Sequence, residues 1–391
     1  MHNLTIATIE WARLEGWRPR SAGCNARLGS HGRKVRAPIA RITTTNGASG
    51  FGWAWLTARQ ARRYLGVQIS DAFRVTPQAL SYVGSDPEVL SPGVDQLSRA
   101  IEYPLLDLVA KVASLPVYRL FASSAAVQLP LRIPCYDTSL YIDDLHLSDD
   151  GEAANLIAQE AAEGIARGHR AFKIKVGRGA LHMPLQAGTR RDIAVIRAVR
   201  QATGPTAQLM IDANNGYNLN LTKQVLGATA DVGLYWIEEA FHEDPRLYAY
   251  LKAWLEKEGL ATLIADGEGD ASPHLIDWAR DGLVDVLQYD IHQPGFTRWR
   301  ELGPVLDAWG ARAAPHNYGD PFGNYALCHL APTLPNFEAA EWDEATVPGL
   351  DTSSYTIREG QAHVPELPGF GLHLDPQAYA RAVEENGFVV S

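Results

Sequence analysis

The sequence contains few cysteines and no long apolar runs. Its three cysteines, Cys24, Cys135 and Cys328, are far apart and odd in number, and no CxxC pair occurs. Neither a disulfide framework nor a zinc–thiolate site is therefore indicated. No stretch approaches the ~18 consecutive apolar residues of a transmembrane helix, and the N-terminus lacks the basic region and long apolar run of a signal peptide. We therefore expect a cytoplasmic protein without a membrane partner.

Runs of basic residues are also missing. The formal net charge of the 391 residues is −10, which argues against a nucleic acid partner. The apolar content of 46% and the charged content of 20% are those of an ordinary globular protein. The chain is long enough for a barrel and a second domain.

What the sequence does contain is a series of short apolar runs that end in charge, between Phe172 and Glu268. They read FKIKVG, MIDANNGY, YWIEEAF and LIADGEG, and helix-like segments such as 191–203 and 222–230 separate them. This is the pattern of βα units in a parallel sheet. Buried strands carry ionisable groups only at their ends, because an unpaired charge inside would cost several kcal/mol. In a barrel the carboxyl ends of the strands meet at one mouth, so these charges should converge there.

The βα alternation predicts a closed barrel. It begins with a strand at 131–136 and an alanine-rich helix at about 151–168, and continues to about residue 341. Eight strands are expected, which is the number that such a barrel requires. Their predicted ends lie near Tyr136, Lys175, Asp212, Glu239, Glu268, Asp290, His316 and Glu341.

The segments before and after the barrel have a different character. Residues 4–14, 39–45 and 52–55 read as strands, and residues 57–121 read as helical, so the N-terminal domain is predicted to be α+β. We place this domain at 1–125 and the barrel at 126–348. The C-terminal segment, 349–391, is expected to pack back on the N-terminal domain and contains a strand-like stretch at 361–364.

The stretch 15–37 is expected to be a loop between the first two strands. One interpretation is a solvated loop; the other is a lid that meets an anionic substrate, because loops rich in hydrogen-bond donors suit carboxylates. Arg18 and Arg20 are its candidate substrate contacts. The stretch also carries Trp17, Arg27, His31, Arg33, Lys34 and Arg36.

Three carboxylates follow one another at the spacing of βα units. Asp212 and Glu238 are 26 positions apart and Glu268 follows 30 positions later, where one unit takes roughly 30 residues. On successive strands they would offer hard oxygen ligands and leave positions open for water and substrate, as Mg²⁺ prefers. The alternative is that each acid caps a helix or forms a salt bridge. Glu239 and Asp266 are expected to support the ligands or to pair with a lysine.

Two lysines occupy one strand in the pattern KxK. Lys173 and Lys175 are two positions apart, so both side chains point the same way. Adjacent ammonium groups lower each other's pKa, and a lysine tuned in this way can act as a base near neutral pH. Exposed edge strands also carry such pairs, but here the pair follows an apolar strand and precedes the acids.

Further polar groups end the later strands. Asp290 on one strand can hold the imidazole of His316 on the next in one tautomer, so that His316 becomes a second acid or base facing Lys175; a purely structural histidine is the alternative. Glu341 ends the eighth strand and, if kept neutral, could donate a proton to a developing oxyanion. Glu338 and Asp343 compete for that role.

Taken together, these motifs resemble the enolase superfamily, and most closely its mandelate racemase group, which includes many sugar-acid dehydratases. The resemblance covers about residues 1–375 and implies an α/β fold, a modified TIM-type (β/α) barrel with an α+β N-terminal capping domain, and one Mg²⁺ per active site. The matching segments are EYPLLDLVAKVASLPVYRLF, FKIKVG, IDANNGY, WIEEAF, IADGE, LQYD, PHN and LPNFEAAE.

The resemblance also implies a role for each residue. It makes Lys175, with Lys173 beside it, the base on one face of the substrate, and the pair of His316 and Asp290 the group on the other face. Glu341 is placed opposite the metal. The metal ligands that it implies are Asp212, Glu238 and Glu268.

The turn after the sixth strand departs from the family pattern. IHQPGFT is one residue short and has Pro294 in place of the first glycine, so Tyr289 could align where Asp290 is placed. A tyrosine cannot replace the carboxylate, and we therefore keep Asp290. The histidine at 316, with no lysine after strand six, argues against the muconate-lactonising and dipeptide-epimerase groups.

The expected reaction begins with removal of the proton α to a carboxylate. If the substrate carries a β-hydroxyl, loss of water gives a 2-keto-3-deoxy acid; if it does not, return of the proton to the other face gives racemisation. The donor-rich stretch 15–37 favours an acid sugar, an aldonate or aldarate, and hence a dehydratase. A racemase, epimerase or cycloisomerase on the same residues remains the alternative.

Two further classes of function fit the sequence less well. A non-catalytic sugar-acid-binding barrel should lack one of the polar positions, and a glycosidase would leave the KxK pair and the histidine–aspartate pair unexplained. The expected partner is a small-molecule carboxylate, and a homo-oligomer is usual for such folds. Substrate contacts are expected from Asn214, Arg18, Arg20, Tyr141 and His292, with Ser139 as a further candidate.

Overall fold

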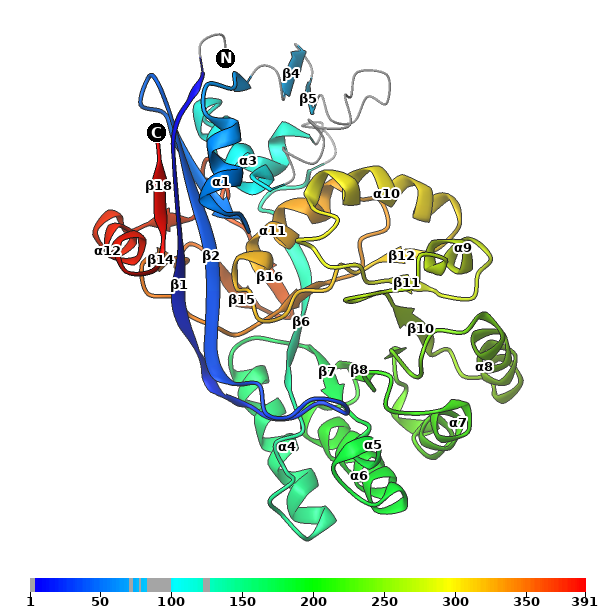
Figure 1. Cartoon of the computed structure of the whole chain (residues 1–391). Coiled ribbons are helices and arrows are strands. Elements are labelled where there is room, and N and C mark those ends of the chain that lie inside the picture. Colours follow the sequence, from blue (N-terminus) through cyan, green and yellow to red (C-terminus); the bar gives the residue numbers. More distant parts are fainter. Residues whose placement is uncertain (1–3, 70–72, 77–78, 83–99, 122–126) are drawn as a thin grey trace.

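The computed structural model describes residues 4–69, 73–76, 79–82, 100–121 and 127–391 (Figure 1). It contains an antiparallel N-terminal sheet with helices, and a ring of parallel strands surrounded by helices. Among these residues no helix is long and apolar enough to cross a membrane.

The N-terminal sheet is built on one long hairpin. Its strands β1 (Ile6–Ala22) and β2 (Gly32–Thr44) pair antiparallel, and β3 (Ser49–Trp53) pairs with β2. The loop expected at 15–37 is therefore wrong: only residues 23–31, which we call the hairpin tip, lie between the two strands. Burial in β1 continues to alternate through Gly16 and Arg18. Because neither of these inward-facing residues is apolar, the hydrophobic pattern did not reveal the strand.

The segment expected to be helical contains both helices and strands. The helices are α1 (Ala58–Ala61) and α3 (Glu102–Val112), with 3₁₀ turns at Arg62–Tyr64 and Val117–Leu120. Two short strands, β4 (Phe73–Thr76) and β5 (Ala79–Tyr82), form a hairpin instead of helix, in keeping with the β-branched and aromatic residues there. The rest of the helical prediction, 83–99, and the proposed domain boundary at 125 lie outside the described residues.

Eight parallel strands form the barrel, as predicted. Neighbours in sequence are neighbours in the sheet, β13 pairs with β6, and a bridge between Ala313 and Phe337 closes the ring. The fold class, a modified TIM-type barrel with an N-terminal α+β domain, is confirmed. The strands are β6 (Arg132–Leu140), β7 (Ala171–Lys175), β8 (Gln208–Asp212), β9 (Trp236–Glu238), β10 (Leu263–Asp266), β11 (Val286–Leu287), β12 (Arg312–Ala313) and β13 (Ala340–Trp342).

Helices surround the ring on the outside (Figure 1). Several begin at capping residues that satisfy the free N–H groups of the first turn. Asp149 caps the first barrel helix through Gly151 and Glu152, and Asp244 caps a later helix that has Pro245 at its start. The barrel helices are α4 (Asp150–Ala166), α5 (Arg178–Leu181), α6 (Leu185–Thr203), α7 (Leu219–Ala228), α8 (Pro245–Glu258), α9 (Leu275–Arg280), α10 (Phe296–Ala308) and α11 (Phe322–Leu330).

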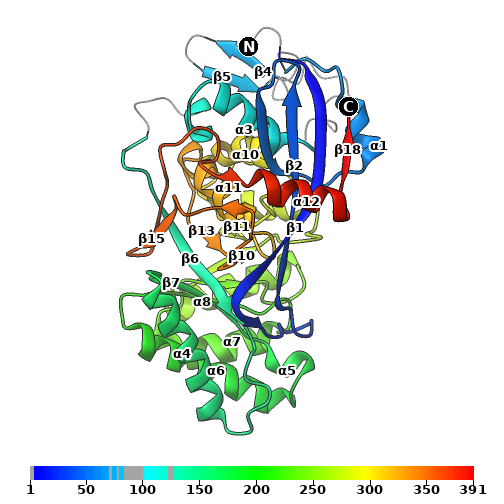
Figure 2. The same ribbon diagram turned by 90° about the vertical axis from the view of Figure 1, so that its left-hand side faces the viewer.

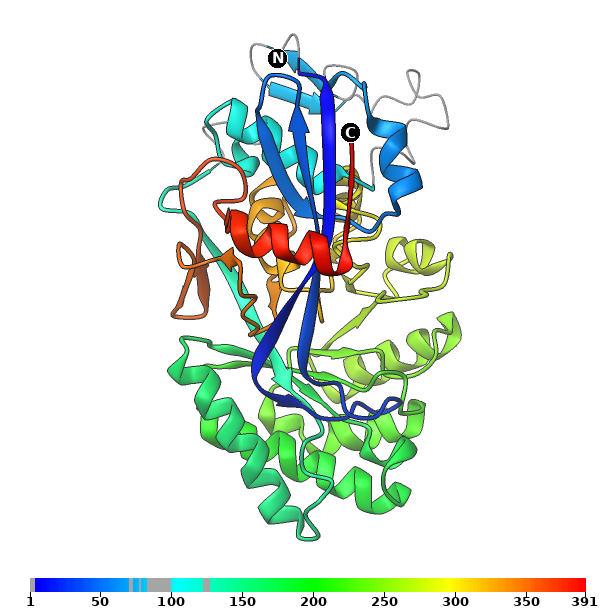
Figure 3. The same ribbon diagram turned by 60° about the vertical axis from the view of Figure 1, so that its left-hand side comes forward.

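The C-terminal segment contacts both the N-terminal sheet and the barrel (Figures 2 and 3). Helix α12 (Pro376–Asn386) lies against β1, and β18 (Phe388–Val390) pairs with β1 as an edge strand of the N-terminal sheet. The strand-like stretch is β16 (Gln361–His363), which pairs with the start of β6 and with β15 (Thr356–Arg358). It therefore extends the barrel sheet. Two short strands, β14 (Leu350–Asp351) and β17 (His373–Leu374), pair with each other.

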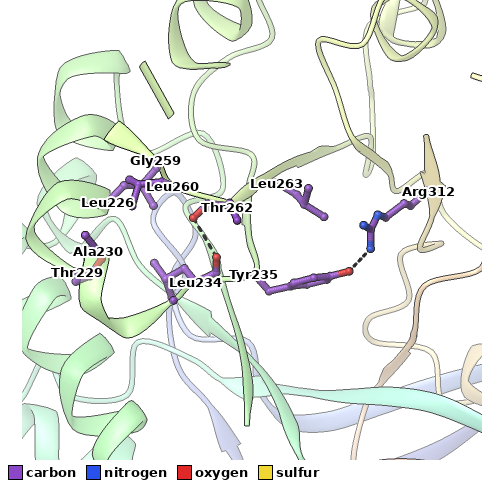
Figure 4. Close-up of a pocket in the computed structure, with 12 residues that line it drawn as sticks. Leu226, Thr229, Ala230, Leu234, Tyr235, Gly259, Leu260, Thr262, Leu263 and Arg312 are labelled. Carbon is purple, nitrogen blue, oxygen red and sulfur yellow. Dashed lines mark hydrogen bonds between the residues drawn. The ribbon is translucent and has the colours of Figure 1, made fainter. Parts of the chain in front are cut away.

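The interior of the barrel is filled below the mouth. Each of the eight strands contributes one buried residue, in the strand or directly beside it, to an apolar layer. This layer includes Tyr136, Met210 and Trp236. At the opposite end, Arg312 at the start of β12 bonds to the hydroxyl of Tyr235 and, at 2.7 Å, to Glu338. Figure 4 shows this end, where a cavity of about 510 Å³ opens beside Tyr235 and Arg312.

Candidate active site

Three adjacent strands bring the predicted acids together at the mouth. Asp212 ends β8 and Glu238 ends β9, and the two residues are partners in the parallel register. Glu268 lies two residues beyond β10, after a turn at Gly267 with φ of 134°. One oxygen from each of the three carboxylates lies within 4.8 Å of the other two. We call Asp212, Glu238 and Glu268 the acid cluster.

The acid cluster has the properties of a divalent-cation site. Its ligands are hard carboxylate oxygens on rigid strand ends, the type that Mg²⁺ prefers. Burial raises the pKa of Glu238 to about 8; Lys173 opposes this shift, and the carboxylates of Asp212 and Glu268 add to it. Such an excess of buried negative charge favours a bound cation, so the residues fit Mg²⁺.

Both lysines of β7 reach the acid cluster. The ammonium of Lys173 lies 2.6 Å from Glu238 and 2.8 Å from Glu341, and that of Lys175 bonds to Asp212. Burial lowers the pKa of Lys175, but Asp212, Glu268 and Glu238 together outweigh it, and the pKa of each lysine is raised. Lys173 does lower the pKa of Lys175, as expected, but the neighbouring carboxylates raise it by more, so the net lowering that was expected does not occur.

His316 is paired with Asp290. Its Nδ1 lies 2.5 Å from the Asp290 carboxylate, and a backbone bridge joins the two residues. Nε2 lies 3.0 Å from Glu268, so this nitrogen faces the acid cluster. Burial lowers the pKa of His316, but Glu268, Glu341 and Asp290 outweigh it and raise the pKa to about 10. Tyr289, the alternative to Asp290, instead packs against Trp299.

Glu341 accepts hydrogen bonds at both oxygens. Thr138 donates to Oε1 at 2.6 Å and the Asn317 N–H donates to Oε2 at 2.7 Å. Burial would raise the pKa of Glu341, but Lys173, His316 and the Asn317 N–H lower it to about 2. These surroundings favour the carboxylate, so the expected neutral proton donor is not what this pocket stabilises. Of its two competitors, Glu338 lies at the far end of the barrel.

Asp343, the other candidate for the role of Glu341, pairs with Arg18, which was expected to bind substrate. Arg18 donates to both oxygens of Asp343 at 3.0 and 2.8 Å and lies over the ring of Tyr318. Arg20 donates to Glu163 on α4 and to the Ser139 carbonyl. The two guanidinium groups therefore join the hairpin to the barrel, and the structure does not place them as free substrate contacts.

Two of the remaining candidates lie at the acid cluster. Asn214 donates to Glu239 at 2.9 Å and to Glu268 at 3.2 Å, while its Oδ1 is buried without a partner among the described residues. The buried ring of Tyr141 lies 5.4 Å from the Lys175 ammonium. Glu239 thus supports a ligand through Asn214, as expected.

His292 and Asp266 are placed differently. The ring of His292 stacks on Trp53 of β3 at 4.3 Å, at the contact with the N-terminal domain. Asp266 accepts a hydrogen bond from Tyr248 on α8 at 2.6 Å. It therefore does not pair with Lys173, because its side chain points to the outer helix layer.

Several residues around the cluster were not predicted. Gln288 donates to Glu238 at 2.8 Å and Trp236 donates to it at 3.1 Å, and Thr138 bonds to Glu341 as described. Gln288 stands two positions before Asp290 in LQYD, so alternation along the strand could have placed it. Thr138 carries no comparable signal in the sequence. His31, in the hairpin tip, packs against Tyr141 and Tyr318.

The chain is similar over its whole length to proteins of solved structure. A structure of galacturonate dehydratase from Geobacillus sp., complexed with D-galacturonate and 5-keto-4-deoxy-D-galacturonate, is 47% identical with a TM-score of 0.91, over 100% of both chains. A mandelate racemase/muconate lactonizing protein from Geobacillus sp. Y412MC10, complexed with magnesium and tartrate, is also 47% identical, with a TM-score of 0.92, over 100% of this chain and 98% of that one.

A curated relative matches over a shorter length. D-galactarolactone cycloisomerase from Agrobacterium fabrum is 34% identical over 164 residues, which is 41% of this chain and 40% of that protein. The family model described as enolase C-terminal domain-like matches residues 156–378, more than half of the chain. The barrel, the acid cluster at its mouth and these matches together show that the chain belongs to the enolase superfamily.

Proposed function

We propose that this protein is an acid-sugar dehydratase, with a hexuronate as substrate and D-galacturonate as the first candidate. The observation that carries the proposal is the placement of two proton-transfer groups, Lys175 and His316, beside different carboxylates of one acid cluster. The similarity to galacturonate dehydratase, at 47% identity over the whole chain, supports the choice of a uronate.

The names of the compounds in that relative's structure fit the expected chemistry. In D-galacturonate the carboxylate is carbon 6, so carbon 5 is the α position and carbon 4 the β position. A 5-keto-4-deoxy product has lost the α proton and the β hydroxyl, which is the outcome of α-proton removal followed by loss of water. Numbered from the carboxylate, it is the 2-keto-3-deoxy acid that the sequence predicts, from a uronate in place of an aldonate or aldarate.

In the proposed reaction each side chain at the mouth of the barrel has a separate role. A bound Mg²⁺ supplies positive charge at the substrate carboxylate, where negative charge develops. Lys173, held by Glu238 and Glu341, presents its ammonium to the same developing charge. Lys175 takes the α proton in its neutral form, which a cation held by Asp212 would favour, because that carboxylate would then no longer stabilise the ammonium. His316 gives a proton from Nε2 to the β hydroxyl, which leaves as water, and Asp290 holds Nδ1. The resulting enol then tautomerises to the ketone.

The test is an assay with D-galacturonate, D-glucuronate and a set of aldonates and aldarates in the presence of Mg²⁺. Semicarbazide should detect a 2-keto product with at least one uronate, and EDTA should abolish it. Loss of water from none of these acids, together with racemisation or exchange of the α proton, would overturn the dehydratase proposal in favour of a racemase or epimerase.

A cycloisomerase is the second candidate, because D-galactarolactone cycloisomerase is 34% identical over part of the chain. The same base would remove the α proton, and the ring oxygen of a lactone would leave in place of a hydroxyl. The shared segment covers only 41% of this chain, which is why we rank this function second. Turnover of D-galactarolactone without turnover of any uronate would reverse the order. A non-catalytic binding barrel is disfavoured because the acid cluster and both proton-transfer groups are present.

We also propose that the enzyme is cytoplasmic and homo-oligomeric. The three free cysteines are compatible with a reducing compartment. The oligomeric state rests on the resemblance alone, and analytical ultracentrifugation of the purified protein tests it.

A further inference from the structure

Four charged side chains near the end of β7 are buried together. Arg178, Arg191, Asp144 and Asp192 are each at most 2% exposed. Two guanidinium groups face two carboxylates, so the four charges sum to zero, and buried ions are tolerated when they are paired in this way. We call these four residues the ion quartet. None of their hydrogen bonds to described residues involves the acid cluster or His316, so the proposed reaction gives the quartet no role.

Arg178, the first residue of α5, is the centre of the ion quartet. Its Nε and Nη2 lie 3.0 and 2.6 Å from the Asp144 carboxylate, and its Nη1 lies 2.8 Å from Asp192. Nη1 also donates to the backbone carbonyl of Lys175 at 3.3 Å. This last contact connects the quartet to a proposed proton-transfer group.

The carbonyl of Lys175 lies where the barrel ladder ends. Pairing between β6 and β7 stops one residue earlier, at Leu140 and its partner. In a parallel ladder the next N–H able to reach β7 would be that of Ile142. It donates instead to the Cys24 carbonyl in the hairpin tip, at 2.9 Å. Arg178 therefore supplies the donor that β6 does not, and a buried carbonyl requires one.

Asp192 holds the other side of the same turn. It accepts hydrogen bonds from the Gly177 N–H at 2.9 Å and from the Tyr217 hydroxyl at 2.8 Å. Gly177 has a φ of 91°, so the chain turns sharply there. Tyr217 lies in the segment that follows Asp212 and β8. The ion quartet thus fixes the turn after β7 relative to the neighbouring strand, which carries one member of the acid cluster.

This support bears on the chemistry because Lys175 must reach the α carbon of the substrate accurately. Lys175 and Asp212 are partners in the register of β7 and β8. A cation bound at the acid cluster would hold Asp212 but not the backbone of Lys175. Misplacing a reacting group by about 1 Å can lower a rate by about 10²-fold, so the end of β7 needs a support of its own.

We propose that Arg178 is a positioning residue for the base. Through the carbonyl of Lys175 it fixes the end of β7, and with it the direction from which the Lys175 amine approaches the α proton. Its effect is confined to the step that removes this proton. The proposal deepens the proposed function and rests on it.

The test uses Arg178→Lys. The charge stays, but an ammonium cannot hold two carboxylates and a carbonyl in the fixed fork of a guanidinium. For D-galacturonate, kcat should fall about tenfold while KM stays within about twofold of the unchanged protein. The deuterium isotope effect at carbon 5 of the sugar should rise, because removal of that proton has become slower. Magnesium binding, measured by calorimetry, should be unchanged.

Arg191→Lys is the matched control. Arg191 belongs to the same quartet and donates to Asp150 at 2.8 Å and to the Leu147 carbonyl at 2.9 Å, but none of its hydrogen bonds to described residues involves Lys175. Both lysine variants should lower the midpoint of urea unfolding, whereas Arg191→Lys should leave kcat and the isotope effect unchanged. Equal losses of kcat in the two variants, an unchanged kcat in Arg178→Lys, or a loss of magnesium affinity in Arg178→Lys would overturn the proposal.

A second variant covers the case in which Arg178→Lys does not fold. Tyr217→Phe keeps every charge of the quartet and removes one donor to Asp192. It should lower kcat by a smaller factor than Arg178→Lys, with KM unchanged and a raised isotope effect. If Tyr217→Phe is the variant that folds and its kcat and isotope effect equal those of the unchanged protein, the proposal is overturned.

The outcome also separates this proposal from the proposed function. If the unchanged protein turns over D-galacturonate and Arg178→Lys matches it, only the role of Arg178 fails. If the unchanged protein exchanges the α proton of one of the assayed acids with D₂O but releases no water, the dehydratase proposal fails, and the exchange rates of the variants with that acid still test Arg178. Exchange with none of the acids would overturn both.

Discussion

At the scale of single residues, the mouth of the barrel is a set of buried charges that depend on one another. Lys173 lies between Glu238 and Glu341, Lys175 bonds to Asp212, and His316 contacts Glu268. Removing one partner of a buried pair leaves the other uncompensated and is strongly destabilising. A loss of overall activity in a variant therefore does not by itself identify a proton-transfer group, and partial reactions are needed.

The first prediction separates the two proton-transfer groups by such a partial reaction. His316→Asn should abolish loss of water while Lys175 still exchanges the α proton of D-galacturonate with D₂O. Lys175→Ala should abolish both. Each loss should amount to about 10²–10⁴-fold, the usual contribution of a general acid or base. Proton NMR follows exchange, and the semicarbazide assay follows product.

The folded fraction of each variant is checked by circular dichroism and by magnesium binding, which both variants should retain. Exchange that persists in Lys175→Ala and disappears in His316→Asn would reverse the two roles. Exchange lost in both would show that the groups act only together.

The residues differ in how far the sequence could identify them. The acid cluster, both lysines, His316 and Asp290 stand at strand ends, so the βα spacing and the motif resemblance were enough to bring them together. Arg18 was misassigned because its partner, Asp343, is 325 positions away. The charge state of Glu341 could not be predicted, since it depends on Lys173, His316 and the Asn317 N–H, which spacing does not place around one carboxyl.

At the scale of elements, the β1–β2 hairpin links the N-terminal sheet to the barrel. Its length was underestimated because Gly16 and Arg18 occupy inward positions that usually hold apolar residues. Gly16 is required by a close approach: a Cβ there would lie 2.4 Å from the Thr346 carbonyl oxygen and 2.8 Å from Val347. Trp17 and Thr346 exchange backbone hydrogen bonds at this point.

The second prediction tests that contact. Gly16→Ala should lower the free energy of unfolding by about 1–3 kcal/mol, because an added methyl group in a closely packed site forces the backbone to move. Gly29→Ala, in the hairpin tip, is the matched control, since nothing lies within 4 Å of a Cβ there. Urea unfolding of both variants gives the comparison. Equal stability of the two would show that β1 can shift away from Thr346 without cost.

A second element-scale contact supports the loop that carries Asp290. Tyr103 on α3 donates its hydroxyl to the Ile291 carbonyl at 2.5 Å, and Glu102 accepts hydrogen bonds from the N–H groups of Phe296 and Thr297 at the start of α10. The N-terminal domain therefore holds the segment 291–297, next to the partner of His316.

The third prediction concerns this support. Tyr103→Phe removes one buried hydrogen bond and should lower kcat several-fold, with KM for D-galacturonate nearly unchanged, because Asp290 is displaced and the substrate contacts are not. The free energy of unfolding should fall by about 1 kcal/mol. Tyr250→Phe, at an exposed site on α8, controls for the loss of a hydroxyl. A rise in KM without a change in kcat would instead indicate that Tyr103 acts on substrate binding.

At the scale of the whole molecule, the fold class could be predicted but the strand pairings between its parts could not. Eight apolar runs at the spacing of βα units, most of which end in a charged residue, specify a barrel, and local periodicity is sufficient for that. The pairing of β16 with β6, and of β18 with β1, joins segments more than 220 positions apart. Such pairings depend on which sheet edges remain free after the barrel and the N-terminal sheet form. No local pattern in Gln361–His363 or Phe388–Val390 encodes the pairing partner.

The last prediction tests how strongly the parts depend on one another. Arg18 of β1 and Asp343, just after β13, form a buried pair with side chains 6% and 2% exposed. Arg18→Met should lower the free energy of unfolding by about 3–5 kcal/mol, because it leaves the Asp343 carboxylate buried without its cation. The double variant Arg18→Met/Asp343→Leu should regain part of this loss, although Gly319 loses its acceptor.

Calorimetry should show one transition for the unchanged protein. If the Arg18–Asp343 pair couples unfolding of the hairpin to unfolding of the barrel, Arg18→Met alone should split that transition in two. A single transition at unchanged temperature would mean that the contacts of the hairpin tip and of α12 are sufficient for this coupling.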